Sequence, residues 1–124
     1  MEFCVIDDDK IYQFLVKKTI KSVDKNFIVN LFEDGLEAIT TFKNKGICCT
    51  IILLDLNMPN MDGWQFIQEY EKLQQIGDQK HKIYIATSSI SKADREKANQ
   101  FKIVQGYLTK PITKEKIKDL ATAV

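Results

Sequence analysis

Four apolar runs in this sequence are followed directly by polar residues that could do chemistry. Those polar residues are Asp7 to Asp9, Asp55, Thr87 to Ser89, and Thr109 with Lys110. If the runs at 2–6 and 51–54 lie side by side, Asp7, Asp8 and Asp55 converge. Three carboxylates at such a distance repel one another unless a cation lies among them. The pattern favours Mg²⁺, which takes hard oxygen ligands and needs only one or two carboxylates.

Lys110 and Thr87 would add the donors that a tetrahedral anion requires. A divalent metal ion, an ammonium group and a hydroxyl around one carboxylate could hold a phosphoryl group. Carboxylates can also act as nucleophiles toward phosphorus, which gives an aspartyl phosphate. We therefore expect Asp55 to attack a phosphoryl donor in line. Mg²⁺ and Lys110 would neutralise the transferring oxygens, and Thr87 would donate a hydrogen bond to the product.

Alternating strand-like and helix-like segments predict the scaffold that positions these residues. Short apolar runs rich in β-branched and aromatic residues predict five strands, at 2–6, 27–32, 51–54, 83–86 and 104–108. Apolar residues at helical spacing lie between them and after the last. This alternation predicts an α/β fold with a doubly wound parallel sheet covered on both faces. In such a sheet the functional crevice lies beyond the carboxyl ends of the strands, where the polar residues stand.

Two segments depart from this regular alternation. Residues 91–103 are mostly polar and offer only a thin apolar stripe, so we expect a short or mobile fourth helix there. Residues 74–82 make a longer polar connection than the fold needs. This connection contains His81, the sole histidine, which we expect to be solvated.

Length and charge exclude several classes of protein. A chain of 124 residues with 44% hydrophobic content is the size of one domain, 1–124. Lys and Arg number 18 against 17 Asp and Glu, so no overall field would attract nucleic acid or a membrane surface. No apolar run approaches the ~20 residues that span a bilayer. We expect a cytoplasmic protein that binds neither nucleic acid nor membrane.

The three cysteines, Cys4, Cys48 and Cys49, have neither the spacing of metal ligands nor an even count. Cys4 and Cys48 fall in or beside apolar segments. We expect all three to be reduced, structural thiols.

The segments VIDDD, LLDLNMPNMDG, IATSS and YLTKP, in this order and at these intervals, resemble the receiver domain of bacterial two-component response regulators. The resemblance covers essentially the whole chain, and single-domain chemotaxis regulators are the most similar type. It implies the flavodoxin-like (βα)5 receiver fold, with strand order 2-1-3-4-5.

The same resemblance implies a role for each site residue. Asp55 would be the phosphoacceptor, and the Mg²⁺ ligands would be Asp8 directly, Asp7 through water, Asp55 itself and the backbone carbonyl of Asn57. Thr87 and Lys110 would contact the phosphoryl group, and the Lys110–Pro111 bond would be cis. Tyr107 would be the switch aromatic, whose ring moves inward as the Thr87 hydroxyl moves toward the phosphoryl group.

Simpler structural roles compete with some of these assignments. Asp9 precedes a helical segment and is expected to be its N-cap. The NMPNMDG segment is ordinary turn chemistry, so its residues are mainly structural. Thr87 could be only a β-branched strand end, and Tyr107 only a half-buried aromatic.

The function expected from these observations is a stand-alone receiver that phosphorylation at Asp55 switches. It would take its phosphoryl group from a histidine kinase or a phosphotransfer protein. Its output would be a downstream protein partner or self-dimerisation, through the face built from the fourth helix, the fifth strand and the fifth helix. This is self-modification, so we do not expect an enzyme that turns over a separate substrate.

Three other functions remain as alternatives. A phosphatase with an aspartate nucleophile would need a second acid two residues after Asp55, where the sequence has Asn57. A flavodoxin-like binding module would need a phosphate loop rich in hydroxyls and glycine after the first strand, but DDDK is acidic. A docking module that works without phosphorylation is disfavoured by the intact Asp55, Thr87 and Lys110.

Overall fold

Five parallel strands and five helices alternate along the chain in the computed structural model, which describes residues 1–46, 49–73, 81–88 and 91–123. The strands are β1 (Glu2–Ile6), β2 (Ile28–Phe32), β3 (Ile51–Leu54), β4 (Lys82–Thr87) and β5 (Val104–Thr109). The helices are α1 (Lys10–Val23), α2 (Gly35–Lys45), α3 (Gly63–Leu73), α4 (Lys92–Ala98) and α5 (Lys114–Thr122).

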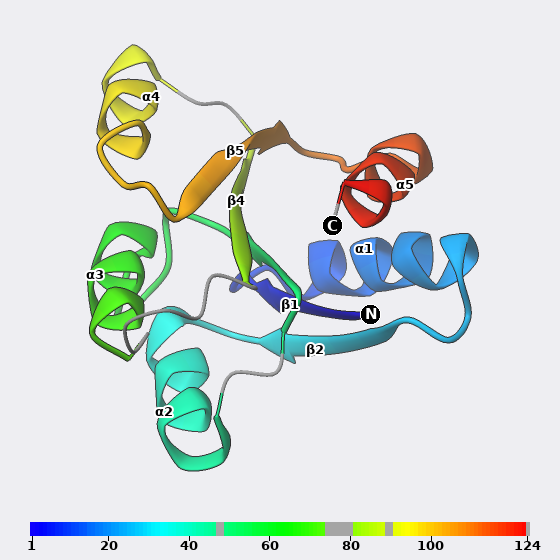
Figure 1. Cartoon of the computed structure of the whole chain (residues 1–124), viewed down its shortest axis with the longest axis horizontal. Helices are drawn as coiled ribbons and strands as arrows, with labels where there is room; N and C mark the ends of the chain where they lie inside the picture. The colour runs from blue at the N-terminus through cyan, green and yellow to red at the C-terminus, as the bar shows by residue number, and fades with distance from the viewer. Residues whose placement is uncertain (47–48, 74–80, 89–90, 124) are drawn as a thin grey trace.

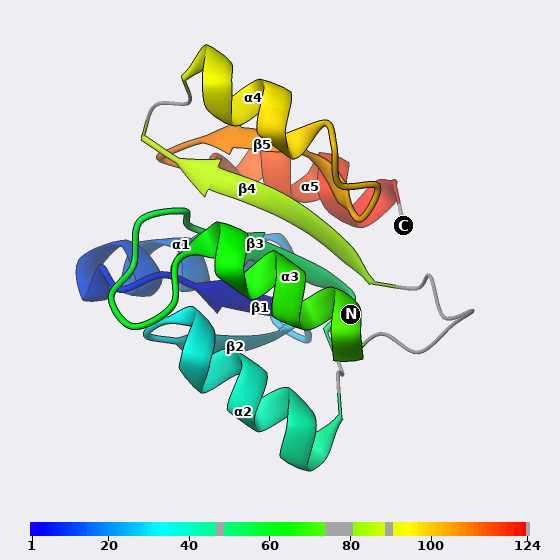
Figure 2. The ribbon, with the colours of Figure 1, turned by 90° about the vertical axis from the view of Figure 1, so that its left-hand side faces the viewer.

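The sheet has the order β2-β1-β3-β4-β5, and all its pairs are parallel. Helices α1 and α5 cover one face, while α2, α3 and α4 cover the other (Figure 1). Figure 2 shows the second face, with the arrowheads of β1 and β4 pointing the same way. The expected doubly wound α/β fold and the strand order are therefore confirmed.

Three clusters of buried side chains fill the space between the layers. We call them the α1–α5 cluster, which includes Phe3, Val16 and Ile117, the α2–α3 cluster, which includes Phe42 and Tyr70, and the α4 cluster. The buried members of the α4 cluster are Leu56, Ile85 and Ala98. β3 is buried along its whole length, as expected for the central strand of a sheet covered on both faces.

Short polar side chains cap the N-termini of α1, α2, α4 and α5. Asp9, Asp34, Ser91 and Thr113 each accept a hydrogen bond from a backbone N–H in the first turn of α1, α2, α4 and α5 respectively. These caps satisfy backbone donors that have no partner within the helix. The expectation that Asp9 is an N-cap is confirmed.

Residues 91–103 contain the short fourth helix that the sequence predicted, because α4 has only seven residues. Of the long polar connection at 74–82, residues 74–80 lie outside the described residues. No helix in the described ranges is long and apolar enough to span a membrane.

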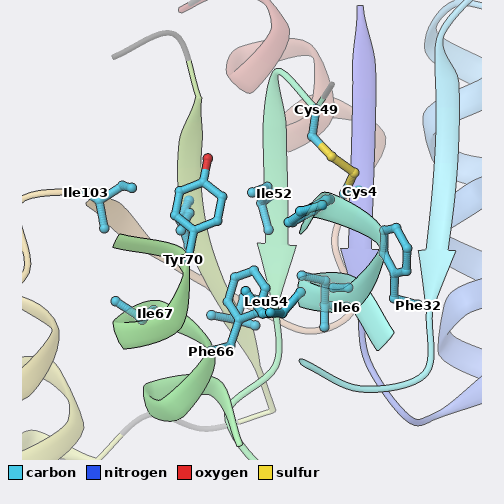
Figure 3. Close-up of a cluster of buried hydrophobic side chains, with 14 residues drawn as sticks. Cys4, Ile6, Phe32, Cys49, Ile52, Leu54, Phe66, Ile67, Tyr70 and Ile103 are labelled. Atoms are coloured by element: carbon cyan, nitrogen blue, oxygen red, sulfur yellow. A yellow bond between two sulfur atoms is a disulfide. The ribbon is translucent and has the colours of Figure 1, made fainter. Parts of the chain in front are cut away.

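Two expectations about single residues are wrong. Cys4 and Cys49 form a disulfide, with their Cα atoms 5.7 Å apart, rather than two free thiols (Figure 3). Cys4 lies on β1, and Cys49 lies just before the neighbouring strand β3, so the topology brings together residues that are 45 positions apart. Cys48 lies outside the described residues. His81 is half-buried, and its Nδ1 contacts the carbonyl oxygen of Cys49 instead of facing open solvent.

Candidate functional site

Three carboxylates meet at the carboxyl ends of β1 and β3. The two strands are neighbours, with Ile6 paired with Leu54, so the residues that follow them emerge at the same edge of the sheet. One carboxylate oxygen from each of Asp7, Asp8 and Asp55 lies within 4.8 Å of the others. The convergence expected from the sequence is present.

Backbone hydrogen bonds hold the two central aspartates in place. The N–H of Asp55 donates to the carbonyl of Ile6, and the N–H of Asp7 donates to the carbonyl of Phe32. The backbone of both residues thus continues the hydrogen-bond ladder of the sheet. Asp7 is 1% exposed and Asp55 is 8% exposed, while Asp8 is exposed.

Gln13 is a supporting residue that the sequence analysis missed. Its side-chain Nε2 lies 2.7 Å from the carbonyl oxygen of Asp7 and 2.9 Å from that of Phe32, and the side chain is buried. It therefore ties α1 to the ends of β1 and β2. A polar residue at helical spacing from Val16 and Ile20, on the apolar face of a helix, was the available signal.

Lys110, which directly follows β5, brings a positive charge to the carboxylates. Its ammonium group forms an ion pair with Asp7 Oδ2 and lies 3.7 Å from Asp55 Oδ1. The backbone N–H of Lys110 donates to the carbonyl of Thr87, which joins the ends of β4 and β5. The Lys110–Pro111 bond is cis, as expected.

Burial and charge raise the pKa values of both central carboxyl groups. For Asp55, burial has the largest effect, and the negative charge of Asp7 adds to it, while Lys110 acts in the opposite direction. For Asp7, burial again raises the pKa, and the hydrogen bond from Lys110 opposes it most strongly. The site therefore holds more negative charge than one lysine balances, which favours binding of a cation.

Tyr12 is a second residue that the sequence analysis did not connect with the site. The Lys110 ammonium lies 4.2 Å from the centroid of its ring, and the side chain is buried. Burial, together with the charges of Asp7 and Asp55, raises the pKa of the phenol. In the sequence, Tyr12 stands at helical spacing from Val16 and Ile20, which predicts only an apolar helix face.

The loop between β3 and α3 folds back tightly against Asp55. The N–H of Gly63 donates to the carbonyl of Leu56. A Cβ at position 63 would lie 2.7 Å from the backbone oxygen of Asp55, so only glycine allows this approach. Asn57 lies in this loop and is exposed.

The remaining expected site residues lie on β4 and β5. Thr87 is the last residue of β4, is 7% exposed and pairs with Thr109 of β5. Tyr107 is half-buried and packs against the α4 cluster. Thr87 is therefore buried at the carboxyl edge of the sheet, and Tyr107 packs beside α4.

The donor set fits a hard divalent cation. Three carboxylates within reach of one another, with one exposed member, offer oxygen ligands and leave room for water. The raised pKa values of Asp7 and Asp55 indicate that negative charge is unfavourable here until a cation offsets it.

Comparison with known proteins gives the family of this fold and site. The family model for the response regulator receiver domain matches residues 3–122. The sensor histidine kinase CheAY of Helicobacter pylori is 30% identical over 112 residues, which is 89% of this chain but 13% of that protein. The chain thus spans a small part of this curated relative.

Solved structures agree with the family model. A two-component response regulator from Cytophaga hutchinsonii is 27% identical, with a TM-score of 0.87 over 98% of this chain and 94% of that one. The receiver domain of a sensor histidine kinase from Pseudomonas aeruginosa, which has a magnesium ion coordinated in its active site cleft, shares the fold at 23% identity. Its TM-score is 0.80 over 98% of this chain and 94% of that one. The chain described here therefore belongs to the response regulator receiver domain family of two-component systems.

Proposed function

We propose that this chain is a phosphoacceptor receiver, in which Asp55 accepts a phosphoryl group in the presence of Mg²⁺ and so switches a surface for partners. The observation that carries the proposal is the arrangement around Asp55. A nearly buried carboxylate at a strand end has two further carboxylates and one ammonium group close to it.

The residues of the site divide the work of phosphoryl transfer. An oxygen of Asp55 forms a bond to phosphorus while the bond from phosphorus to the leaving group breaks, and the leaving group keeps the electron pair. The Lys110 ammonium neutralises charge on the transferring oxygens. Thr87 donates its hydroxyl hydrogen to an oxygen of the phosphoryl group.

Asp7, Asp8, Asp55 and the backbone carbonyl of Asn57 are the ligands that we propose for Mg²⁺. When bound, the ion supplies positive charge that offsets the carboxylates and polarises the phosphoryl oxygens. Backbone hydrogen bonds from Asp55 to β1 and from Asp7 to β2 fix the main chain that carries two of these ligands.

The proposal also covers the partners of the chain and its subcellular location. The phosphoryl donor would be a histidine kinase or a phosphotransfer protein. The face of α4, β5 and α5, which includes Tyr107 as the switch aromatic, would bind a downstream protein or a second copy of the chain. The chain would act as one receiver domain over 1–124, in the cytoplasm, and would modify only itself. The Cys4–Cys49 disulfide is the one observation that opposes the cytoplasmic part, because disulfides are rare there.

Intact-protein mass spectrometry tests the proposed chemistry. The wild type is incubated with a small acyl phosphate, with and without Mg²⁺, beside Asp55→Asn and a control, Asp24→Asn. Asp24 is exposed and follows the far end of α1, away from the carboxylates. We expect one phosphoryl adduct on the wild type and on the control, only with Mg²⁺, and none on Asp55→Asn.

An adduct that survives in Asp55→Asn would place the acceptor elsewhere. If no variant is labelled while a known receiver is labelled in parallel, the chain would instead be a docking module that works without phosphorylation.

A further inference from the structure

Tyr12 lies where α1 meets the acidic site, and none of the roles assigned so far uses it. It is in the first turn of α1, and its ring belongs to the α1–α5 cluster. Only 9% of the residue is exposed. Packing alone would therefore explain an aromatic side chain at this position, but two features of Tyr12 go beyond packing.

The first feature is the contact between the ring and Lys110. The ammonium group lies 4.2 Å from the ring centroid, while the same group pairs with Asp7 and lies 3.7 Å from Asp55 Oδ1. A cation over an aromatic face is attracted by the ring, and the attraction grows as water is excluded. Lys110 is thus held from three sides, and the ring is the only one of the three that carries no charge.

This contact bears on where the ammonium group rests. A flexible lysine drawn only by carboxylates would follow whichever of Asp7 and Asp55 carries more negative charge. A fixed aromatic face gives the ammonium group a position that does not depend on those charges. Such a fixed position is what transition-state stabilisation by a preorganised charge requires.

The second feature is the phenolic hydroxyl. It is buried, and it has no hydrogen-bond partner among the described residues. A buried hydroxyl without a partner is unfavourable, and phenylalanine would fill the same volume without that penalty. The hydroxyl keeps its proton at neutral pH, because an ordinary phenol has a pKa of about 10. It can therefore donate a hydrogen bond to an oxygen.

We propose that Tyr12 is a positioning residue of the phosphoryl-accepting site. Its ring holds the Lys110 ammonium beside Asp55, and its hydroxyl donates to an oxygen that enters the site with the phosphoryl group. This inference rests on the proposed function, and it adds a residue from α1 to a site built from strand ends.

The ring is tested by replacing it with an aliphatic side chain. In Tyr12→Leu we expect labelling by a small acyl phosphate at saturating donor to slow by about tenfold, with a smaller change in the donor concentration that gives half the maximal rate. The matched control is Phe14→Leu, two residues along α1. Phe14 is exposed, and its ring also carries a lysine, Lys18, at 5.3 Å. The control should label at the wild-type rate.

A double-mutant cycle separates positioning from packing. If Tyr12 acts through Lys110, Tyr12→Leu should slow labelling in the wild type but have almost no further effect in Lys110→Ala. If the two losses simply multiply, Tyr12 does not act through Lys110 and the positioning role is overturned. The control Phe14→Leu should leave the labelling rate unchanged both in the wild type and in Lys110→Ala.

The hydroxyl is tested by Tyr12→Phe, which keeps the ring. Binding of beryllium fluoride, a stable mimic of the phosphoryl group, is measured by calorimetry in the presence of Mg²⁺. We expect Tyr12→Phe to bind it about fivefold more weakly, because one hydrogen bond is missing. The free protein should unfold at the same or a higher temperature, because the hydroxyl had no partner there.

Equal binding of the mimic by Tyr12→Phe and the wild type would overturn the role of the hydroxyl. These outcomes differ from those expected if the proposed function is wrong. If the chain does not accept a phosphoryl group, the wild type itself would neither be labelled nor bind the mimic, whatever residue stands at position 12.

Discussion

Asp55 lies between two regions of the core that differ greatly in size. Leu54, the residue before it, belongs to the α2–α3 cluster, which has 14 buried residues in the described ranges (Figure 3). Leu56, the residue after it, belongs to the α4 cluster, which has three. A change at Asp55 can therefore reach a well-packed region on one side and a thinly packed region on the other.

The difference indicates where the molecule can move. The α2–α3 cluster contains the ring of Phe42, three aromatic rings packed against it, and a disulfide. It should therefore open only when the whole domain unfolds. The α4 cluster is covered by a seven-residue helix and by partly buried side chains, including Tyr107. Segments that reorganise in switching proteins come from such regions of low local stability.

The largest effect that we expect comes from emptying the α2–α3 cluster. The ring of Phe42 lies 5.7 Å from that of Phe32 and 6.2 Å from that of Tyr70, measured between centroids. Phe42→Ala should lower the free energy of unfolding by about 4 kcal/mol, measured by urea denaturation. Tyr107→Leu, in the α4 cluster, should lower it by about 1 kcal/mol. If both variants lost the same free energy of unfolding, the α2–α3 and α4 clusters would not differ in local stability.

The disulfide gives the next effect in size. Cys4 and Cys49 close a loop with a sequence separation of 45, so reduction should lower the free energy of unfolding by about 3 kcal/mol. Thiol titration of the denatured chain should find one reactive thiol before reduction and three after it, since the chain has three cysteines. Three reactive thiols before reduction would show that the cysteines are free, as the sequence predicted. The stability of the α2–α3 cluster would then come from side-chain packing alone.

A smaller effect, of opposite sign, is expected at the site itself. Because burial raises the folded-state pKa of Asp55 above 3.8, the folded protein binds more protons than the unfolded chain between those two pKa values. Its stability falls as pH rises through that window. Asp55→Asn removes this loss and should unfold with a free energy greater than that of the wild type by on the order of 1 kcal/mol at neutral pH.

The gain in Asp55→Asn should shrink as pH falls toward 3.8, where the wild-type carboxyl group becomes protonated. Added Mg²⁺ should also reduce it, by stabilising the wild type more than the variant. Chemical denaturation at several pH values, with and without Mg²⁺, measures both trends. A variant less stable than the wild type at neutral pH would contradict the assignment of unbalanced charge to this site.

The smallest effect concerns the contact between α3 and α4. The Lys97 ammonium lies 4.9 Å from the ring of Trp64, which also stacks on Phe101. Lys97 is exposed, so Lys97→Ala should change the free energy of unfolding by only about 0.5 kcal/mol. Trp64 is the sole tryptophan, so its fluorescence should report the change in local environment. A loss of several kcal/mol would show that α4 is held more firmly than its small cluster indicates.

The strands and the edge that carries the site could be predicted from sequence because both depend on local patterns. Apolar runs define strands, and the polar residues directly after them must lie at the carboxyl edge of a parallel sheet. The positions of Asp7, Asp55 and Lys110 follow from that rule. The order of the strands does not, because periodicity says nothing about which strands pair; resemblance to the family supplied it.

What escaped prediction depends on contacts across the fold. Tyr12 and Gln13 read as ordinary residues of an amphipathic helix, and only the packing of α1 against the strand ends brings them to the site. The pairing of Cys4 with Cys49 requires that β1 and β3 be neighbours. The contact of His81 with the carbonyl of Cys49 depends on the same arrangement.

Amide hydrogen exchange, followed by mass spectrometry before and after phosphorylation with a small acyl phosphate and Mg²⁺, tests the central claim most directly. The account predicts altered exchange in α4 and β5, no change in α2 and α3, and no change anywhere in Asp55→Asn. Unaltered exchange in α4 and β5 of the phosphorylated wild type, or equal changes on both sides of Asp55, would contradict it.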